Sequence, residues 1–122
     1  MNAAVFELNV SLPTDARFAE TMRELAAHAA RYAGCRGADA DLYAAAVQAV
    51  VADCLAHGIA EGTPLRAIVR RAHGPLEFLI ACERRFETLA VDDEQIVIGW
   101  TMEAETVMCR VARLMPAEAS NV

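Results

Sequence analysis

Alternating apolar and polar side chains near the start of the chain predict a β-strand. From Val5 to Leu12 apolar and polar side chains alternate over most of the segment, so one face can pack on a core while the other meets water. Pro13 ends this pattern. Thr14 followed by Asp15 is a typical helix N-cap, because the hydroxyl can accept a backbone N–H and the carboxylate is favoured at the positive end of the helix dipole.

Two helices are predicted next. The first ends near Gly34, and Asp39 is expected to cap the second, which should end at Gly58. Both carry apolar residues at helical spacing, which indicates one buried face each. The buried stripe of the first helix is Phe18, Met22, Leu25, Ala29 and Tyr32. That of the second is Leu42, Tyr43, Ala46, Val47, Val50, Cys54 and Leu55.

The second half of the chain reads as strands. Residues 65–72 and 76–83 are short apolar runs separated by a turn containing Gly74 and Pro75, which leaves no room for a crossover helix and predicts a hairpin. Residues 95–102 are rich in β-branched side chains and predict another strand. Residues 106–114 fit both a strand and a helical stripe, and intrinsic propensity favours helix.

Composition narrows the function classes. The 122 residues suffice for one domain, and 56% of them are hydrophobic. A net charge of −6 argues against nucleic acid as the main partner, because such binding requires a surface that neutralises several phosphates. All 11 basic residues are arginine, which excludes chemistry that needs a lysine amine. No signal peptide or membrane-spanning run is recognisable, so a cytoplasmic protein without membrane association is expected.

The candidate chemical groups are few. The four cysteines have no CxxC pair and no histidine at ligand spacing, which argues against a zinc site and predicts mostly buried thiols. Asp53 is an unusual carboxylate within an apolar helix. It is either a solvent-facing residue on a narrow polar stripe with Gln48 or a weak candidate for a metal ligand, and no other metal or cofactor site is expected. His57, in the last helical turn, is interpreted as structural.

Motifs in the second helix carry a family resemblance. Ala46-Val47 and His57-Gly58 are similar to the ends of an N-box, and the chain resembles a degenerate member of the histidine-kinase-like (GHKL) ATPase superfamily, in particular the small anti-sigma-factor serine kinases. The resemblance places the family's glutamate at Ala49 and its magnesium-binding asparagine at Asp53. A carboxylate at 53 could still bind Mg²⁺, but no side chain remains at 49 to act as a base.

The remaining family motifs are replaced. Residues 76–87 resemble the strand that ends in Asp-x-Gly, with Cys82 where the aspartate would bind adenine and Arg84 where the glycine would be. The glycine-rich lid is missing, and Glu105 replaces a glycine before the closing strand. The resemblance implies an α+β fold: a two-layer sandwich with a mixed, mostly antiparallel sheet of about five strands covered on one face by two helices. It favours a strand at 106–114, and one domain over 1–116 followed by a tail at 117–122.

The loss of these motifs predicts a protein that no longer binds or uses a nucleotide but still binds a partner through its surface. Two helices cover one face of a sheet, so the other face should expose apolar side chains and bind a partner. The candidates for this open face are Ile68, Leu79, Ile98 and Trp100. We therefore expect a non-catalytic regulatory or adaptor protein of bacterial signalling that binds a protein partner or forms a homodimer, without ATP. The alternatives are an ATP-dependent anti-sigma-factor serine kinase with a divergent N-box, in which Asp53 holds Mg²⁺, and a small-molecule binding module.

Overall fold

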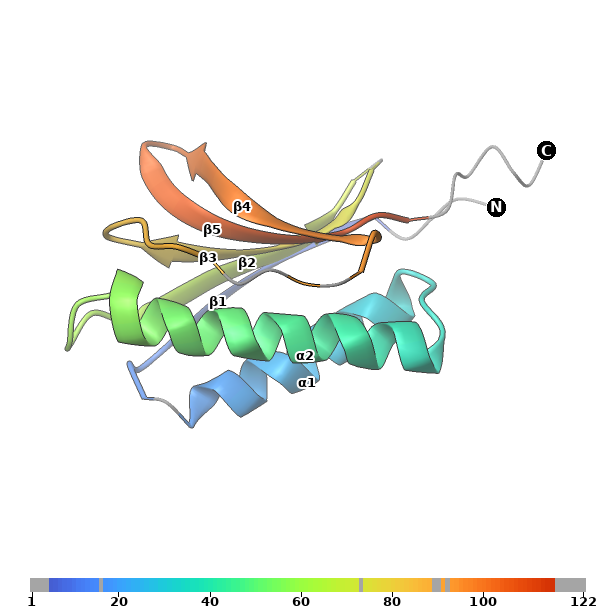
Figure 1. Cartoon of the computed structure of the whole chain (residues 1–122), viewed down its shortest axis with the longest axis horizontal. Helices are drawn as coiled ribbons and strands as arrows, with labels where there is room; N and C mark the ends of the chain where they lie inside the picture. The colour runs from blue at the N-terminus through green and yellow to red at the C-terminus, as the bar shows by residue number, and fades with distance from the viewer. Residues whose placement is uncertain (1–4, 16, 73, 89–90, 92, 116–122) are drawn as a thin grey trace.

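The computed structural model describes residues 5–15, 17–72, 74–88, 91 and 93–115. The fold has two layers, a five-stranded sheet and two helices that cover one of its faces (Figure 1). The elements in chain order are β1 (Phe6–Leu12), α1 (Phe18–Tyr32), α2 (Gly37–Asp53), a π-helical turn η1 (Cys54–Gly58), β2 (Leu65–Arg71), β3 (Leu76–Cys82), β4 (Ile96–Glu103) and β5 (Thr106–Arg113). The predicted two-layer α+β architecture is confirmed. The tail predicted at 117–122 lies outside the described residues.

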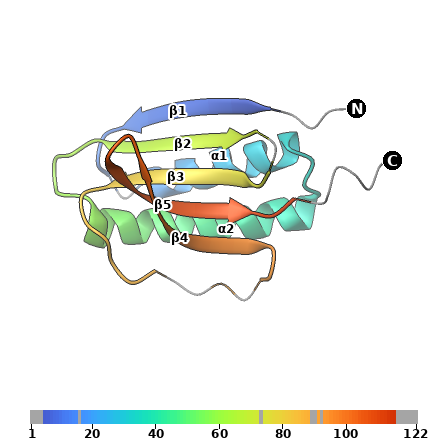
Figure 2. The same cartoon turned by 90° about the horizontal axis from the view of Figure 1, so that it is seen from above.

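The strand order is β1-β2-β3-β5-β4 (Figure 2). Every neighbouring pair of strands is antiparallel, whereas the prediction was a mixed, mostly antiparallel sheet. β5 lies between β3 and β4, pairs with β4 along its whole length and with β3 from Val107 to Arg113, which confirms the strand at the ambiguous segment. Two ladders of backbone hydrogen bonds outweigh the modest helix propensity of these residues. Within the described part of the chain, neither helix is long and apolar enough to cross a membrane.

Both helices begin without the predicted caps. α1 starts at Phe18, and the Thr14 hydroxyl is buried without a hydrogen bond to any described residue. Asp15 instead accepts a hydrogen bond from the backbone N–H of Arg17 at 2.9 Å. It also forms an ion pair with the Arg17 guanidinium. α2 starts at Gly37, so Asp39 lies within the first turn. There it pairs with Arg113 of β5 at 3.4 Å, a tertiary contact that the local sequence pattern does not reveal.

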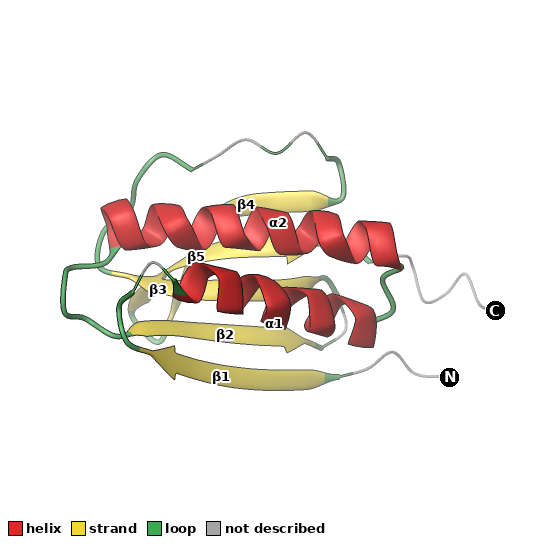
Figure 3. Ribbon diagram, turned by 90° about the horizontal axis from the view of Figure 1, so that it is seen from below, coloured by secondary structure: helices red, strands yellow, loops and turns green. Residues whose placement is uncertain are grey.

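The main core lies between the helices and the sheet. α1 and α2 run side by side across the same face (Figure 3). Met22, Tyr43 and Val47 of the helices are fully buried against Leu65 and Phe78 of the strands. The Tyr43 hydroxyl donates a 2.8 Å hydrogen bond to a β5 carbonyl, so even the polar atom of this side chain is satisfied inside the core.

The β4–β5 hairpin shapes the opposite face of the sheet. Its tip residues, Ala104 and Glu105, both have positive φ, 50° and 70°, as in the tight turns whose twist matches that of paired strands. The hairpin bends away from the helices, and its tip lies over the sheet beside β3 and β2 (Figures 1 and 2). The face without helices is therefore partly covered by the sheet's own last hairpin.

Candidate functional site

Asp53 is not part of a cluster of metal-ligating side chains among the described residues. It is half-buried in the last turn of α2 and makes no hydrogen bond or ion pair with any described residue. Across the described residues, no three His, Cys, Asp or Glu side chains are arranged to hold a metal ion. A bound Mg²⁺ at this position would therefore rely on one carboxylate, whereas such sites usually combine carboxylates with substrate phosphates.

The turn η1, which follows α2, is hydrogen-bonded to the residues that follow β3. The carbonyl of Gly58 accepts a hydrogen bond from the backbone N–H of Glu83 at 2.7 Å, and the Arg84 guanidinium donates to the carbonyl of His57 at 2.7 Å. Arg84, which stands at a family glycine in the resemblance, thus fastens β3 to the helix end. Arg84 therefore has a structural role that does not involve a nucleotide.

Aromatic packing fills the same corner. A Cβ atom on Gly58 would lie 2.9 Å from Cε1 of Phe86 and 3.0 Å from Sγ of Cys82, so only glycine fits without movement. The Phe86 ring in turn meets Trp100 edge-on, with ring centroids 5.1 Å apart. The chain's own side chains therefore occupy the space next to Cys82, the position at which the resemblance places an adenine contact.

Three of the four cysteines are buried, and all four are free thiols, in agreement with their interpretation as small core residues. Hydrogen bonding with Cys109 and Cys82, together with burial, raises the pKa of the Cys54 thiol well above its ordinary range. A thiol held in its protonated form is a poor nucleophile. Cys54 is therefore a packing residue at the helix–sheet junction.

The four predicted partner-binding residues divide between the two faces of the sheet. Ile68 and Leu79 pair with each other on the face without helices. Ile98 and Trp100 pair with Val111 and Cys109 and pack against the helix-side core, so their predicted position on the open face is wrong. The reason is the register of β4, since residues that alternate along a strand point to opposite faces and a shift of one position exchanges them.

Leu79 is also not available to a partner, because it is fully buried. With Met108 and Ala112 it forms a small buried group on the face without helices, separate from the main core. Arginine side chains on neighbouring strands supply aliphatic stems that cover apolar surface while their charged ends stay near water. Of the two predicted residues that do lie on this face, Leu79 is buried and Ile68 is half-buried.

An ion-pair network lies over this buried group. Glu77 of β3 accepts hydrogen bonds from Arg70 at 2.9 Å and from Arg110. Arg70 also donates two hydrogen bonds to Glu103 at the end of β4, at 2.9 and 3.0 Å. Burial opposes ionisation of Glu77, but the hydrogen bonds from both arginines outweigh it and hold its pKa below the ordinary value. The network links β2, β3, β4 and β5.

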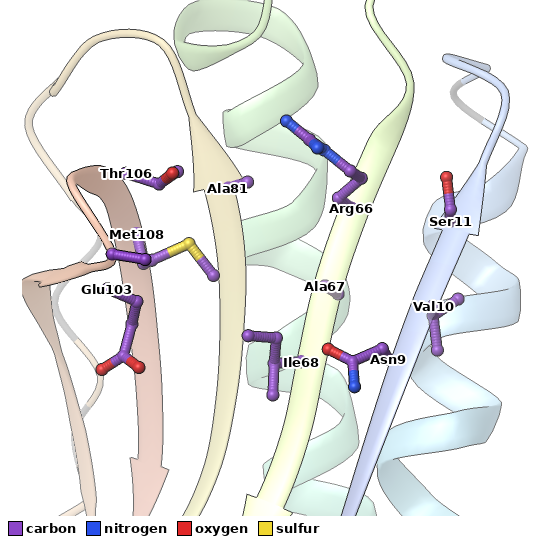
Figure 4. Close-up of a pocket in the computed structure, with 11 residues that line it drawn as sticks. Asn9, Val10, Ser11, Arg66, Ala67, Ile68, Ala81, Glu103, Thr106 and Met108 are labelled. Atoms are coloured by element: carbon purple, nitrogen blue, oxygen red, sulfur yellow. The ribbon is translucent and has the colours of Figure 1, made fainter.

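A groove opens beside this network, between the hairpin tip and strands β1 and β2 (Figure 4). We call it the hairpin groove. Its volume is about 420 Å³, and its lining residues are Asn9, Val10, Ser11, Arg66, Ala67, Ile68, Ala81, Glu103, Ala104, Thr106 and Met108. The side chains of Ile68, Ala81 and Met108 form an apolar floor, and Asn9, Ser11, Arg66 and Thr106 place polar groups around it (Figure 4). Ile68 is one of the predicted partner-binding residues, but no sequence pattern brings the lining residues together, because they come from distant segments.

A different surface lies at the β1 edge of the sheet. β1 pairs only with β2, so its other edge has no strand partner among the described residues. Leu8 is 47% exposed and Tyr32 of α1 is 67% exposed, and the Tyr32 ring meets Phe6 edge-on at 5.4 Å between centroids. We call Phe6, Leu8 and Tyr32 the edge patch. The sequence pattern assigned all three to buried faces. Phe6 is indeed half-buried against the main core, whereas Leu8 and Tyr32 are exposed, because periodicity cannot show where α1 stops covering β1.

Comparison with known proteins adds no functional information. No family model matches this chain, and no curated protein is detectably similar to it. Its function must therefore be inferred from its own surfaces and side chains.

Proposed function

We propose that the protein is a non-catalytic regulatory or adaptor protein that acts by binding protein, in the first place a second copy of itself along the β1 edge. The observation that carries this proposal is the free edge of β1 next to the exposed edge patch. The resemblance to anti-sigma-factor kinases suggests bacterial signalling in the cytoplasm as its setting, with nucleotide binding lost.

The composition of β1 supports an interface at this edge. Edge strands expose unpaired N–H and C=O groups, and monomeric proteins usually protect them with lysine, proline, bulges or very short strands. β1 has seven residues, carries Glu7 as its one charged side chain and contains no proline. Two copies related by a twofold axis could pair β1 with β1 in antiparallel fashion and bury both edge patches, as in a self-complementary dimer.

The packing at the end of α2 supports the absence of nucleotide chemistry. Phe86 lies against Gly58 and Cys82, and Arg84 is hydrogen-bonded to the helix end. An adenine at this corner would have to displace an aromatic ring that is itself packed on Trp100. Catalysis of phosphoryl transfer depends on positioned phosphates and metal, and Asp53 is the single carboxylate that the resemblance offers for this purpose.

The first experiment measures the oligomeric state by light scattering after gel filtration at tens of micromolar protein. We expect the wild type at twice its 13.2 kDa chain mass. Leu8→Lys should yield the single-chain mass, because a charge would be buried at the interface. Leu42→Lys is the matched control: Leu42 is 54% exposed on α2, far along the chain from the edge, and its variant should remain dimeric. A monomeric wild type, or equal behaviour of the two variants, refutes the β1 interface.

The second experiment is a calorimetric titration with Mg-ATP. We expect no saturable binding with a Kd below about 100 μM, which corresponds to roughly 5.5 kcal/mol. Saturable binding in that range would contradict the loss of nucleotide chemistry and would favour the serine kinase alternative.

A further inference from the structure

We propose that the hairpin groove is a binding site for a small organic carboxylate with an apolar body, anchored by Arg66. This inference does not depend on self-association through β1 or on the loss of ATP binding. It rests on the distribution of charge over the face without helices and on the shape and lining of the groove.

Among the described residues, Arg66 is an arginine of this face without an acidic partner. Arg70 and Arg110 lie on the same face, and Glu77 and Glu103 neutralise them. Arg66 is exposed, pairs in the strand ladder with Ser11, and forms no ion pair with any residue of the described chain. A guanidinium with all its donors available is suited to a carboxylate, because the planar fork matches the two oxygens.

The other groups of the groove complement a ligand of this kind. Ile68, Ala81 and Met108 provide an apolar floor, and Asn9, Ser11 and Thr106 offer hydrogen-bonding groups near the rim (Figure 4). A volume of about 420 Å³ lies within the range of small-molecule sites, which combine a mainly apolar lining with a few convergent polar groups.

The charge balance favours a monoanion over a phosphate ester. Glu103 borders the groove, although Arg70 holds its carboxylate. A second hollow of about 260 Å³ shares Arg66 and is also lined by Glu83 and Glu105. The Arg66 guanidinium can compensate one negative charge, whereas a doubly charged phosphate would leave a second charge to be repelled by the carboxylates that line the two hollows.

The test uses 4-phenylbutyrate as the probe, with 4-phenylbutanol as its neutral match and phenyl phosphate as the dianionic comparison. Binding is followed by ¹⁵N–¹H correlation spectra of the wild type and of Arg66→Met, which keeps an apolar stem without the charge. Arg85→Met is the matched control, since Arg85 is an exposed arginine outside the groove. Asn9→Asp is a second variant that adds a negative charge to the groove wall.

We expect 4-phenylbutyrate to bind the wild type saturably below about 10 mM and to shift amide signals of β1, β2 and the hairpin tip. Arg66→Met and Asn9→Asp should each weaken it about tenfold and leave 4-phenylbutanol unchanged, while Arg85→Met alters neither. Phenyl phosphate should bind no more tightly than 4-phenylbutyrate. The proposal is overturned by absence of saturable binding, by equal effects of Arg66→Met and Arg85→Met, by shifts confined to the helices, or by tighter binding of phenyl phosphate.

Discussion

Removing the charge of Glu77 should destabilise the protein measurably, because this carboxylate joins two arginines over the face without helices. The Glu77 side chain is 19% exposed, and those of Arg70 and Arg110 are 27% and 29% exposed, so the pairs are neither buried nor freely solvated. Hydrogen bonds to charged groups contribute about 1.5–3 kcal/mol when buried and exposed ion pairs about 0.2–1 kcal/mol. In Glu77→Gln, Arg70 keeps its ion pair with Glu103, while Arg110 loses its ion pair with residue 77. We therefore expect the free energy of unfolding to fall by about 1–3 kcal/mol at neutral pH.

The pH dependence of this loss provides the sharper test. The folded-state pKa of Glu77 lies below its ordinary value, so the stability it contributes is fully present above the unfolded-state pKa. That contribution disappears as the pH falls through the folded-state pKa. The free-energy difference between wild type and Glu77→Gln should therefore shrink from about pH 7 to about pH 3.

Urea unfolding followed by circular dichroism gives both free energies across this pH range. Glu61→Gln is the control, because Glu61 is an exposed carboxylate without an ion pair among the described residues, and its effect should stay within about 0.5 kcal/mol. A loss for Glu77→Gln below about 0.5 kcal/mol at neutral pH, or a loss that does not diminish on acidification, would refute the structural role assigned to the network.

Four further substitutions test particular contacts by thermal or urea unfolding. Tyr43→Phe should cost about 1–3 kcal/mol, since a buried carbonyl loses its 2.8 Å partner, and a neutral effect would contradict this. Gly58→Ala should cost about 1–3 kcal/mol, because its Cβ would lie 2.9 Å from Phe86, and wild-type stability would show that the ring moves freely. Glu105→Gly should stabilise by up to about 1 kcal/mol, because glycine adopts a φ of 70° without the steric cost of a Cβ atom, and a destabilised variant would contradict this. Asp53→Asn should change stability by under about 0.5 kcal/mol, and a melting-temperature rise with Mg-ATP in the wild type alone would restore its metal role.

The local pattern of the sequence determined the elements of the fold. The alternation from Phe6 to Leu12, the helical stripes of the next segments and the turn before Leu76 each involve neighbours along the chain, and all of these elements are present. Segment 106–114 was ambiguous because its neighbouring residues support two patterns. Its own residues fit helix and strand alike, and only pairing with β3 and β4 on both sides decides for strand.

Which face a strand residue occupies was decided by the tertiary structure. Ile98 and Trp100 lie towards the helices because β4 pairs with β5 in one particular register, and no local signal specifies that register. Leu79 lies on the predicted face, yet it is buried, because residues from three other strands gather over it.

The candidate sites likewise exist only in the folded chain. Arg66 and Arg70 are four positions apart in the same strand, and the sequence does not show why one is paired and the other free. The difference arises because the β4–β5 hairpin brings Glu103 onto Arg70 across 33 positions of the chain and leaves the groove beside Arg66 open. Hydrophobic periodicity is a property of neighbouring residues, whereas charge pairing and cavities depend on which distant segments meet, and that is settled by the packing of the whole sheet.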